Sequence, residues 1–262
     1  MPELIDYASA ILSASEKNLQ ANALNLANVS TPGFKRQAAF SDILRQCGDA
    51  PACVAETVLQ FDFRQGNLSQ TGQPLDLGIY GPGLLQLRDE DRLVYTRGGS
   101  FRIVEDGKLA DADGRVLQQQ GGGDLTIAGT QPTILGDGTV LENGVPRARI
   151  ALVEVPDPTA LKAAGGSTFS VGSERLEDAE KSSIRQGFLE SSNVTTSDEM
   201  VSMMASVRHA ESGGRLAQFY DQLMGHVNNG LAQSSEAAAH YSYRHRIERE
   251  RMRSLQDGQG SA

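Results

Sequence analysis

The residues of this chain that could do chemistry are few, and the two cysteines come first. Cys47 and Cys53 enclose the stretch Gly-Asp-Ala-Pro-Ala. This spacing matches neither a four-ligand zinc pattern nor the two-residue gap of a thioredoxin-like redox pair. Two interpretations stay open: the thiols remain free, or they close a short disulfide loop in an oxidising compartment.

The other candidates for chemistry are histidines, an acidic turn and a glycine run. The histidines lie in the C-terminal third, where no Ser or Cys nucleophile sits in a strand-to-turn setting: His209, His226, His240 and His245. The sequence "DADG" at 111–114 lacks a calcium-loop pattern, because Leu109 stands at the first ligand position and no Glu follows at the twelfth. The run "GGGDLT" at 121–126 lacks the spacing of a phosphate-binding loop. We therefore expect no enzyme activity, no cofactor and no metal.

Composition favours a soluble globular protein. The 262 residues include 39% hydrophobic and 22% charged residues, and the formal net charge is −9, so nucleic acid and anionic membranes are not expected partners. No run approaches the roughly 20 apolar residues of a membrane span, so we expect no membrane insertion. The first residues have no positively charged region followed by an apolar stretch, and we expect no cleavable signal peptide.

Glycine and proline divide the chain into regions. Of 28 glycines, 21 lie between Gly48 and Gly187, and no proline follows Pro158. This predicts an α+β chain with a mainly-β, Gly-rich central domain, flanked by long N- and C-terminal helices that pack as a coiled-coil-like layer. The predicted regions are an N-terminal assembly helix (1–28), a turn and extended linker (29–76), a β-rich body (77–186), a C-terminal box and assembly helix (187–229) and an extra, partly helical tail (230–262).

The N-terminal helix carries a narrow heptad seam. Its expected interface residues are Ile5, Ala8, Leu12, Leu19 and Leu26, and the polar Ser15 and Asn22 continue the same spacing. Leucine recurs at one heptad position, whereas the other holds small or polar residues. Such a helix needs a partner, and we expect both terminal helices to be loosely held in the monomer and to order on polymerisation.

The central region has short apolar stretches at intervals of roughly 8 to 12 residues, as in antiparallel β-structure. The stretches include "LLQLR", "RLVYTR", "DLTIAG" and "ARIALVEV". Four dipeptides predict hairpin turns: Asp106-Gly107, Asp113-Gly114, Asp137-Gly138 and Asn143-Gly144.

The C-terminal helix is expected to begin at Thr196, with Glu199 completing a capping box. Its expected interface residues are Met200, Met203, Val207, Ala210, Ala217, Tyr220, Met224 and Val227. The pair Gly213-Gly214 predicts either a hinge or a close backbone approach. A separate terminal helix is expected from about 235 to 255. Its arginines alternate with glutamates, which suits a solvated face or a contact for an acidic protein partner.

Four stretches, in order, resemble the bacterial flagellar rod and hook proteins. They are "NALNLANVSTPGFKRQAAFSDIL", "GNLSQTGQPLDLGIYGPGLLQL", "VYTRGGSFRIVEDGKLADADGRVL" and "IRQGFLESSNVTTSDEMVSMMASVRHAE". The family turn motif would comprise Asn28, Thr31, Pro32, Gly33, Phe34 and Lys35. A type II turn suits residues 31–34, and we expect Lys35 and Arg36 to make polar contacts just outside the helical seam.

The resemblance implies a structural axial subunit of the flagellar basal-body rod, which polymerises through its terminal helices and transmits torque. Implied partners are other rod subunits, neighbouring axial proteins and the flagellar type III export apparatus, with a periplasmic location after export. The stretch "VRHAESGG" departs from the distal-rod pattern and favours the proximal rod; a distal rod protein is the alternative. A cell-wall or carbohydrate-binding β domain with oligomerisation helices is a further alternative, although the chain has no Trp.

Overall fold

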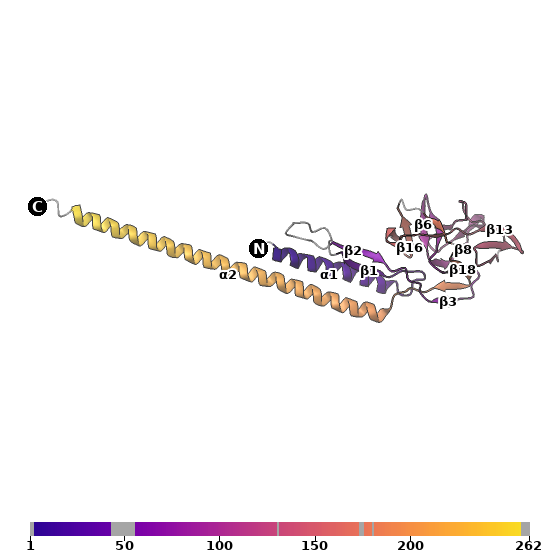
Figure 1. The fold of residues 1–262 in the computed structure, drawn as a ribbon, viewed down its shortest axis with the longest axis horizontal. Coiled ribbons are helices and arrows are strands. Elements are labelled where there is room, and N and C mark those ends of the chain that lie inside the picture. Colours follow the sequence, from indigo (N-terminus) through magenta and orange to yellow (C-terminus); the bar gives the residue numbers. More distant parts are fainter. Residues whose placement is uncertain (1–2, 43–55, 130, 173–175, 180, 258–262) are drawn as a thin grey trace. The chain divides into compact units, whose positions relative to one another are not determined.

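The computed structural model describes residues 3–42, 56–129, 131–172, 176–179 and 181–257. Helix α1 (Glu3–Ala27) begins the chain and helix α2 (Thr196–Asp257) ends it, and the described strands lie between them in the sequence (Figure 1). The chain is therefore α+β. It divides into two compact units, Ala14–Arg208 and a second made of Met1–Ser13 with His209–Ala262, and both helices contribute to both units.

The β-structure of the first unit is antiparallel throughout its described pairings. One large sheet has the order β15-β16-β6-β5-β10-β9-β8, with β14 pairing both β5 and β17. Its strands are β5 (Leu84–Asp89), β6 (Arg92–Thr96), β8 (Arg102–Ile103), β9 (Leu109–Ala110), β10 (Val116–Leu117), β14 (Leu152–Glu154), β15 (Leu161–Gly165), β16 (Thr168–Val171) and β17 (Glu177–Asp178).

Four smaller sheets complete the first unit. Two of them have three strands: β11 (Thr133–Ile134) with β12 (Thr139–Glu142) and β13 (Val145–Arg149), and β18 (Ser183–Gln186) with β4 (Asp76–Tyr80) and β7 (Gly98–Ser100). The other two are the pairs β1 (Gln37–Asp42) with β2 (Glu56–Phe61), and β3 (Leu68–Gln70) with β19 (Phe188–Glu190). Short 3₁₀ turns occur at Glu105–Gly107 and Pro158–Ala160. The stretch expected as a linker thus contains strands.

Two apolar clusters form the core of this β body. The larger one includes Leu77, Ile79, Leu85, Leu87 and Phe101, all buried. The smaller one contains Phe169, whose ring lies 5.1 Å from the rings of both Phe61 and Phe63. Burial of this kind is the dominant stabilising contribution to a folded domain.

The predicted hairpin dipeptides have the backbone that tight turns require. Asn143 and Gly144, with φ of 51° and 81°, join β12 to β13, and Asp106 and Gly107 have φ of 71° and 72°. Other expectations were wrong in detail. The stretch "DLTIAG" forms only isolated bridges, and "ARIALVEV" divides into β13 and β14.

Helix α2 runs through Gly213, Gly214 and Gly230 without a break. The expected helix end near Gly230 is wrong, because no Gly or Pro occurs from 231 to 257 and good helix formers continue the helix. At Gly213 the close approach is confirmed and the hinge is not: an added Cβ would lie 3.1 Å from Ile11 Cγ2 and 3.2 Å from Leu12 Cγ, within the second unit.

Candidate functional site

The turn that follows α1 brings the chain to the β body. Gly33 has φ +71°, and the Phe34 N–H donates to the Thr31 carbonyl over 3.3 Å, as a type II turn requires. The Gly33 N–H donates to the Glu190 carbonyl over 2.7 Å. Asn28 closes the helix by donating from Nδ2 to the Leu24 carbonyl over 2.8 Å. The turn is therefore fixed to β19, far away in the sequence.

Directly after the turn lies a cluster that we call the polar junction. It consists of Asn25, Lys35, Arg36, Arg97, Glu190 and Glu199. These residues come from α1, the segment after the turn, the β6–β7 connection, β19 and α2. The polar junction therefore gathers both helices and the β body of the first unit.

Glu190 is the centre of the first half of the polar junction. Lys35 Nζ lies 2.6 Å from Glu190 Oε1 and also donates to the Arg64 carbonyl over 2.7 Å. Arg97 Nε donates to Glu190 Oε2 over 3.1 Å, and its Nη1 donates to the Gly83 carbonyl over 2.5 Å. All three charged side chains are at most 2% exposed. Removing one member of such a buried cluster leaves the charge of the others without a counter-charge and without water.

Burial and pairing act in opposite directions on the two cations. The pKa values of Lys35 and Arg97 are both lowered, because burial lowers them more than the Glu190 carboxylate raises them. One carboxylate thus serves two buried cations, and the Gly66 N–H donates to its Oε1 as well, over 2.8 Å. Glu190 is the group on which this half of the junction depends.

Glu199 is the centre of the second half. Asn25 Nδ2 donates to Glu199 Oε2 over 3.0 Å, and Arg36 Nε forms a short ion pair with Glu199 Oε1. Asn25 also pairs with the Gln37 backbone, accepting from its N–H and donating to its carbonyl, each over 2.8 Å. Glu199 is 1% exposed. The expected capping box is therefore wrong: this carboxylate binds α1 and the post-turn segment, and the Thr195 carbonyl accepts from the first-turn N–H groups.

The helices pair antiparallel through small and polar side chains. In the first unit, Asn22 Nδ2 donates to Ser202 Oγ over 3.1 Å, and Ser15 and Ser206 are buried. In the second unit, Ala8 is buried, and so is Gly213, whose backbone approaches Ile11 and Leu12.

Most of the expected interface residues are not buried within their own units. Among them only Ala8 is buried; Leu19, Leu26, Ala210, Ala217 and Tyr220 are half-buried; Ile5, Leu12, Met200, Met203, Val207, Met224 and Val227 are exposed. Most side chains of the apolar stripes are therefore at least partly exposed within their own units, although Leu12 lies against Gly213. Their role as an assembly interface stays a prediction.

The other expected residues are the two cysteines, the residues of the turn, and Lys35. Cys47 and Cys53 lie outside the described residues. Pro32 is exposed and Phe34 is buried. Lys35 was expected just outside the helical seam, but it is fully buried against Glu190 in the β body.

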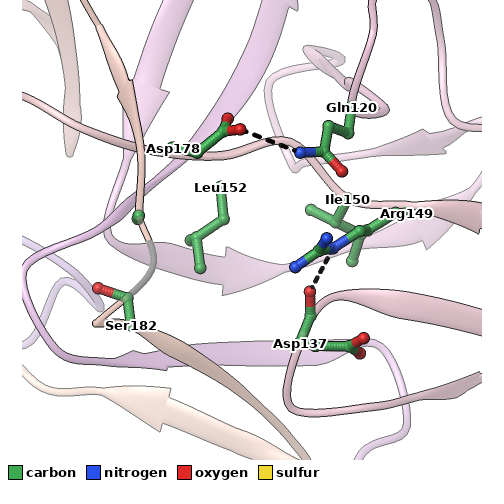
Figure 2. A pocket seen from close by; sticks show the side chains of 8 residues that line it. Gln120, Asp137, Arg149, Ile150, Leu152, Asp178 and Ser182 are labelled. Atoms are coloured by element: carbon green, nitrogen blue, oxygen red, sulfur yellow. Dashed lines mark hydrogen bonds between the residues drawn. The ribbon is translucent and has the colours of Figure 1, made fainter.

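One hollow of the β body is lined by side chains that take part in hydrogen bonds. Figure 2 shows this hollow of about 260 Å³, where Arg149 Nε donates to the Asp137 carbonyl over 2.8 Å and Gln120 Nε2 donates to Asp178 Oδ2 over 3.3 Å. Within the described ranges, no group of three potential metal ligands is present. Of the helices there, none is both long and apolar enough to cross a membrane.

Sequence reasoning missed Arg97, Glu190 and Glu199 as partners. Each stands inside a stretch that resembles the flagellar family, "VYTRGGSF", "GFLESSN" and "TTSDEM". The available signal was charge: Arg97 and Glu190 adjoin apolar or glycine-rich strand residues, where an ionised side chain needs a partner.

Comparisons with known proteins agree with this architecture. The model of the flagellar hook protein FlgE/F/G D1 domain matches residues 78–144, and that of the flagellar basal body rod FlgEFG protein C-terminal region matches residues 185–229. The chain is 28% identical over 266 residues to flagellar basal-body rod protein FlgG of Borreliella burgdorferi, covering 85% of this chain and 96% of the relative.

Two further relatives extend the comparison. Flagellar hook-basal body complex protein FlhP of Bacillus subtilis is 26% identical over 260 residues, covering 85% of this chain and 97% of the relative. Flagellar basal-body rod protein FlgF of Caulobacter vibrioides is 31% identical over 216 residues, covering 76% of this chain and 86% of the relative. This chain belongs to the flagellar basal-body rod protein family.

Proposed function

We propose that this chain is a structural axial subunit of the flagellar basal-body rod, which polymerises through its terminal helices and has no catalytic role. The observation that carries the proposal is the placement of apolar side chains on the helices. Met200, Val201 and Met204 are 48%, 68% and 62% exposed, whereas Asn22 and Ser206 are buried. Side chains of this kind gain stability when a neighbouring subunit covers them.

The polar junction gives this assembly a mechanical connection. Because Glu199 binds Asn25 and Arg36, and Glu190 binds Lys35 and Arg97, a load on the helices reaches the β body through buried charged contacts as well as through the chain. On this proposal the helices form a coiled-coil-like layer, and the β body fixes the spacing of the subunits.

Within the rod we propose the proximal section, with export by the flagellar type III apparatus and a periplasmic destination. The support is the "VRHAESGG" stretch; relatives named FlgF and FlgG both match. Electron microscopy of basal bodies from a deletion strain separates the two positions. Loss of the whole rod supports the proximal one, and loss of the distal part alone supports the distal alternative.

The proposed assembly surface consists of the expected interface residues of α1 and α2. It is tested with Leu19→Asp and Met203→Asp. Each introduces a charge among apolar side chains, which costs several kcal/mol when it stays unpaired in an interface. We expect loss of rods and swimming with an unchanged melting transition of the β body. A matched control is Gln20→Asp, at an exposed position next to Leu19. Normal rods with both Leu19→Asp and Met203→Asp would refute the proposal that these helix positions form the assembly surface.

A further inference from the structure

Helix α2 extends well beyond its partner helix. In the second unit Gly213 lies against Ile11 and Leu12. Because the helices run antiparallel, the N-terminal residue of α1, Glu3, lies opposite about residue 222 of α2. From there α2 continues to Asp257, about 35 residues and roughly 50 Å at 1.5 Å per residue. We call residues 223–257 the overhang. The C-terminal family match ends at residue 229, so most of the overhang lies outside it.

The overhang begins with an apolar row. Phe219, just before it, and Leu223 and Val227 within it are 56%, 46% and 52% exposed, at successive steps of four residues. Residues four apart lie on the same side of a helix. The start of the overhang therefore has an apolar face that its own α1 does not cover.

The end of the overhang is basic. Between 244 and 253 the sequence has five arginines and two glutamates. In the helix, positions 246, 249 and 253 share one face at i, i+3 and i+7, whereas positions 244 and 251 share another face with Glu248. The arginine positions 246, 249 and 253 define what we call the basic face.

The paired helices have the opposite charge. Residues 3–27 and 196–222 include seven acidic and three basic residues, a formal charge of −4. Several of these carboxylates are exposed: Asp6, Glu16, Asp198, Glu211 and Asp221. A basic helix is attracted to such a surface at short range.

We propose that the overhang docks on the paired α1 and α2 helices of a second copy of this chain, with the apolar row and the basic face as its contacts. A continuous helix cannot fold back on itself, and the α1 of the same chain has already ended, so the acidic helices that the overhang reaches are those of another copy. The inference rests on the proposed axial assembly and adds a contact outside the family's C-terminal match.

The test uses full-length protein with two matched double charge reversals. R249E/R253E alters the basic face, and R244E/R251E changes the net charge equally on the other face. Self-association is measured by sedimentation at about 0.1 M and 1 M salt, where the screening lengths are about 10 and 3 Å. We expect native association to weaken at high salt, R249E/R253E to weaken it about tenfold at low salt, and R244E/R251E to weaken it less.

A charge swap identifies the partner surface. Mixing R249E/R253E with the exposed acidic-helix variant E211R/D221R should restore association. Equal association of R249E/R253E and native protein, or no recovery in the mixture, overturns the inference. So does binding of the native chain to phosphatidylglycerol vesicles that R249E/R253E loses while its self-association is unchanged. Absence of the native chain from isolated basal bodies would instead refute the proposed function, whatever the charge swap shows.

Discussion

The β body and the terminal helices bury opposite kinds of side chain. In the body Leu77 and Leu85 are 0% exposed. In the helices it is Asn25 that is 0% exposed, while Leu12 is 39% exposed. The body therefore buries most of its large apolar side chains in its own core, whereas many of those on the helices stay exposed within their own units.

This difference separates folding from assembly within one chain. The body gains its stability from its own core, so substitutions there are expected to affect the monomer. The outward stripes contribute little to the monomer, so substitutions there are expected to affect the polymer. The polar junction is the exception, because it binds the helices to the body inside a single molecule.

The largest effect is expected from Glu190→Ala. It leaves Lys35 and Arg97 buried without a counter-charge, which costs about 3–5 kcal/mol of unfolding free energy. Urea unfolding of the full chain measures the loss. The control is Asp62→Ala, which removes an ion pair to the 84% exposed Arg64 and should change little. A similar small loss in both variants would show that the junction does not stabilise the monomer.

The next effect compares two leucines. Leu85→Ala removes a fully buried side chain from the larger core cluster, and we expect a loss of about 2–5 kcal/mol. Leu12 is 39% exposed on α1, and Leu12→Ala should lower the unfolding free energy of the monomer by less than about 1 kcal/mol. Urea unfolding with hydrogen exchange of the α1 amides measures both. Equal losses would contradict the division between body and helices.

The smallest effect compares adjacent glycines of α2. Gly214→Ala meets no atom within 4 Å and should stabilise the helix by about 0.5–1 kcal/mol, because alanine has the higher helix propensity. At Gly213 the new methyl crowds Ile11 and Leu12, which offsets that gain. Hydrogen exchange of neighbouring amides reports the difference. If Gly213→Ala stabilises the helix as much as Gly214→Ala, the helices are not in close contact there.

Local features of this fold could be predicted from the sequence. The turn after α1 follows from Pro32 and Gly33, and the tight hairpins follow from Asp-Gly and Asn-Gly pairs, because each depends on the backbone preferences of a few adjacent residues. The heptad spacing likewise indicated α1. Its positions Ala8, Ser15 and Asn22 are buried, but the spacing did not indicate that Leu12 of the same seam stays exposed, since periodicity identifies a stripe and not how far each side chain is covered.

The polar junction could not be predicted in the same way. Lys35 and Glu190 are 155 positions apart, and Asn25 and Glu199 are 174 apart. No local pattern joins such residues, and a lysine after a turn is usually exposed. The capping-box spacing also led to a wrong prediction, because the Glu199 carboxylate binds Asn25 and Arg36, which are distant in the sequence.

The separation between Lys35 and Glu190 also has a kinetic consequence. In a chain that emerges with its N-terminus first, Lys35 appears 155 residues before the carboxylate that neutralises it, and almost the whole body lies between them. The entropy of closing so long a loop opposes this contact until other contacts have brought the two segments together. We therefore expect the Glu190 cluster to close only after much of the body has formed, and its closure to complete the connection between the turn after α1 and the body.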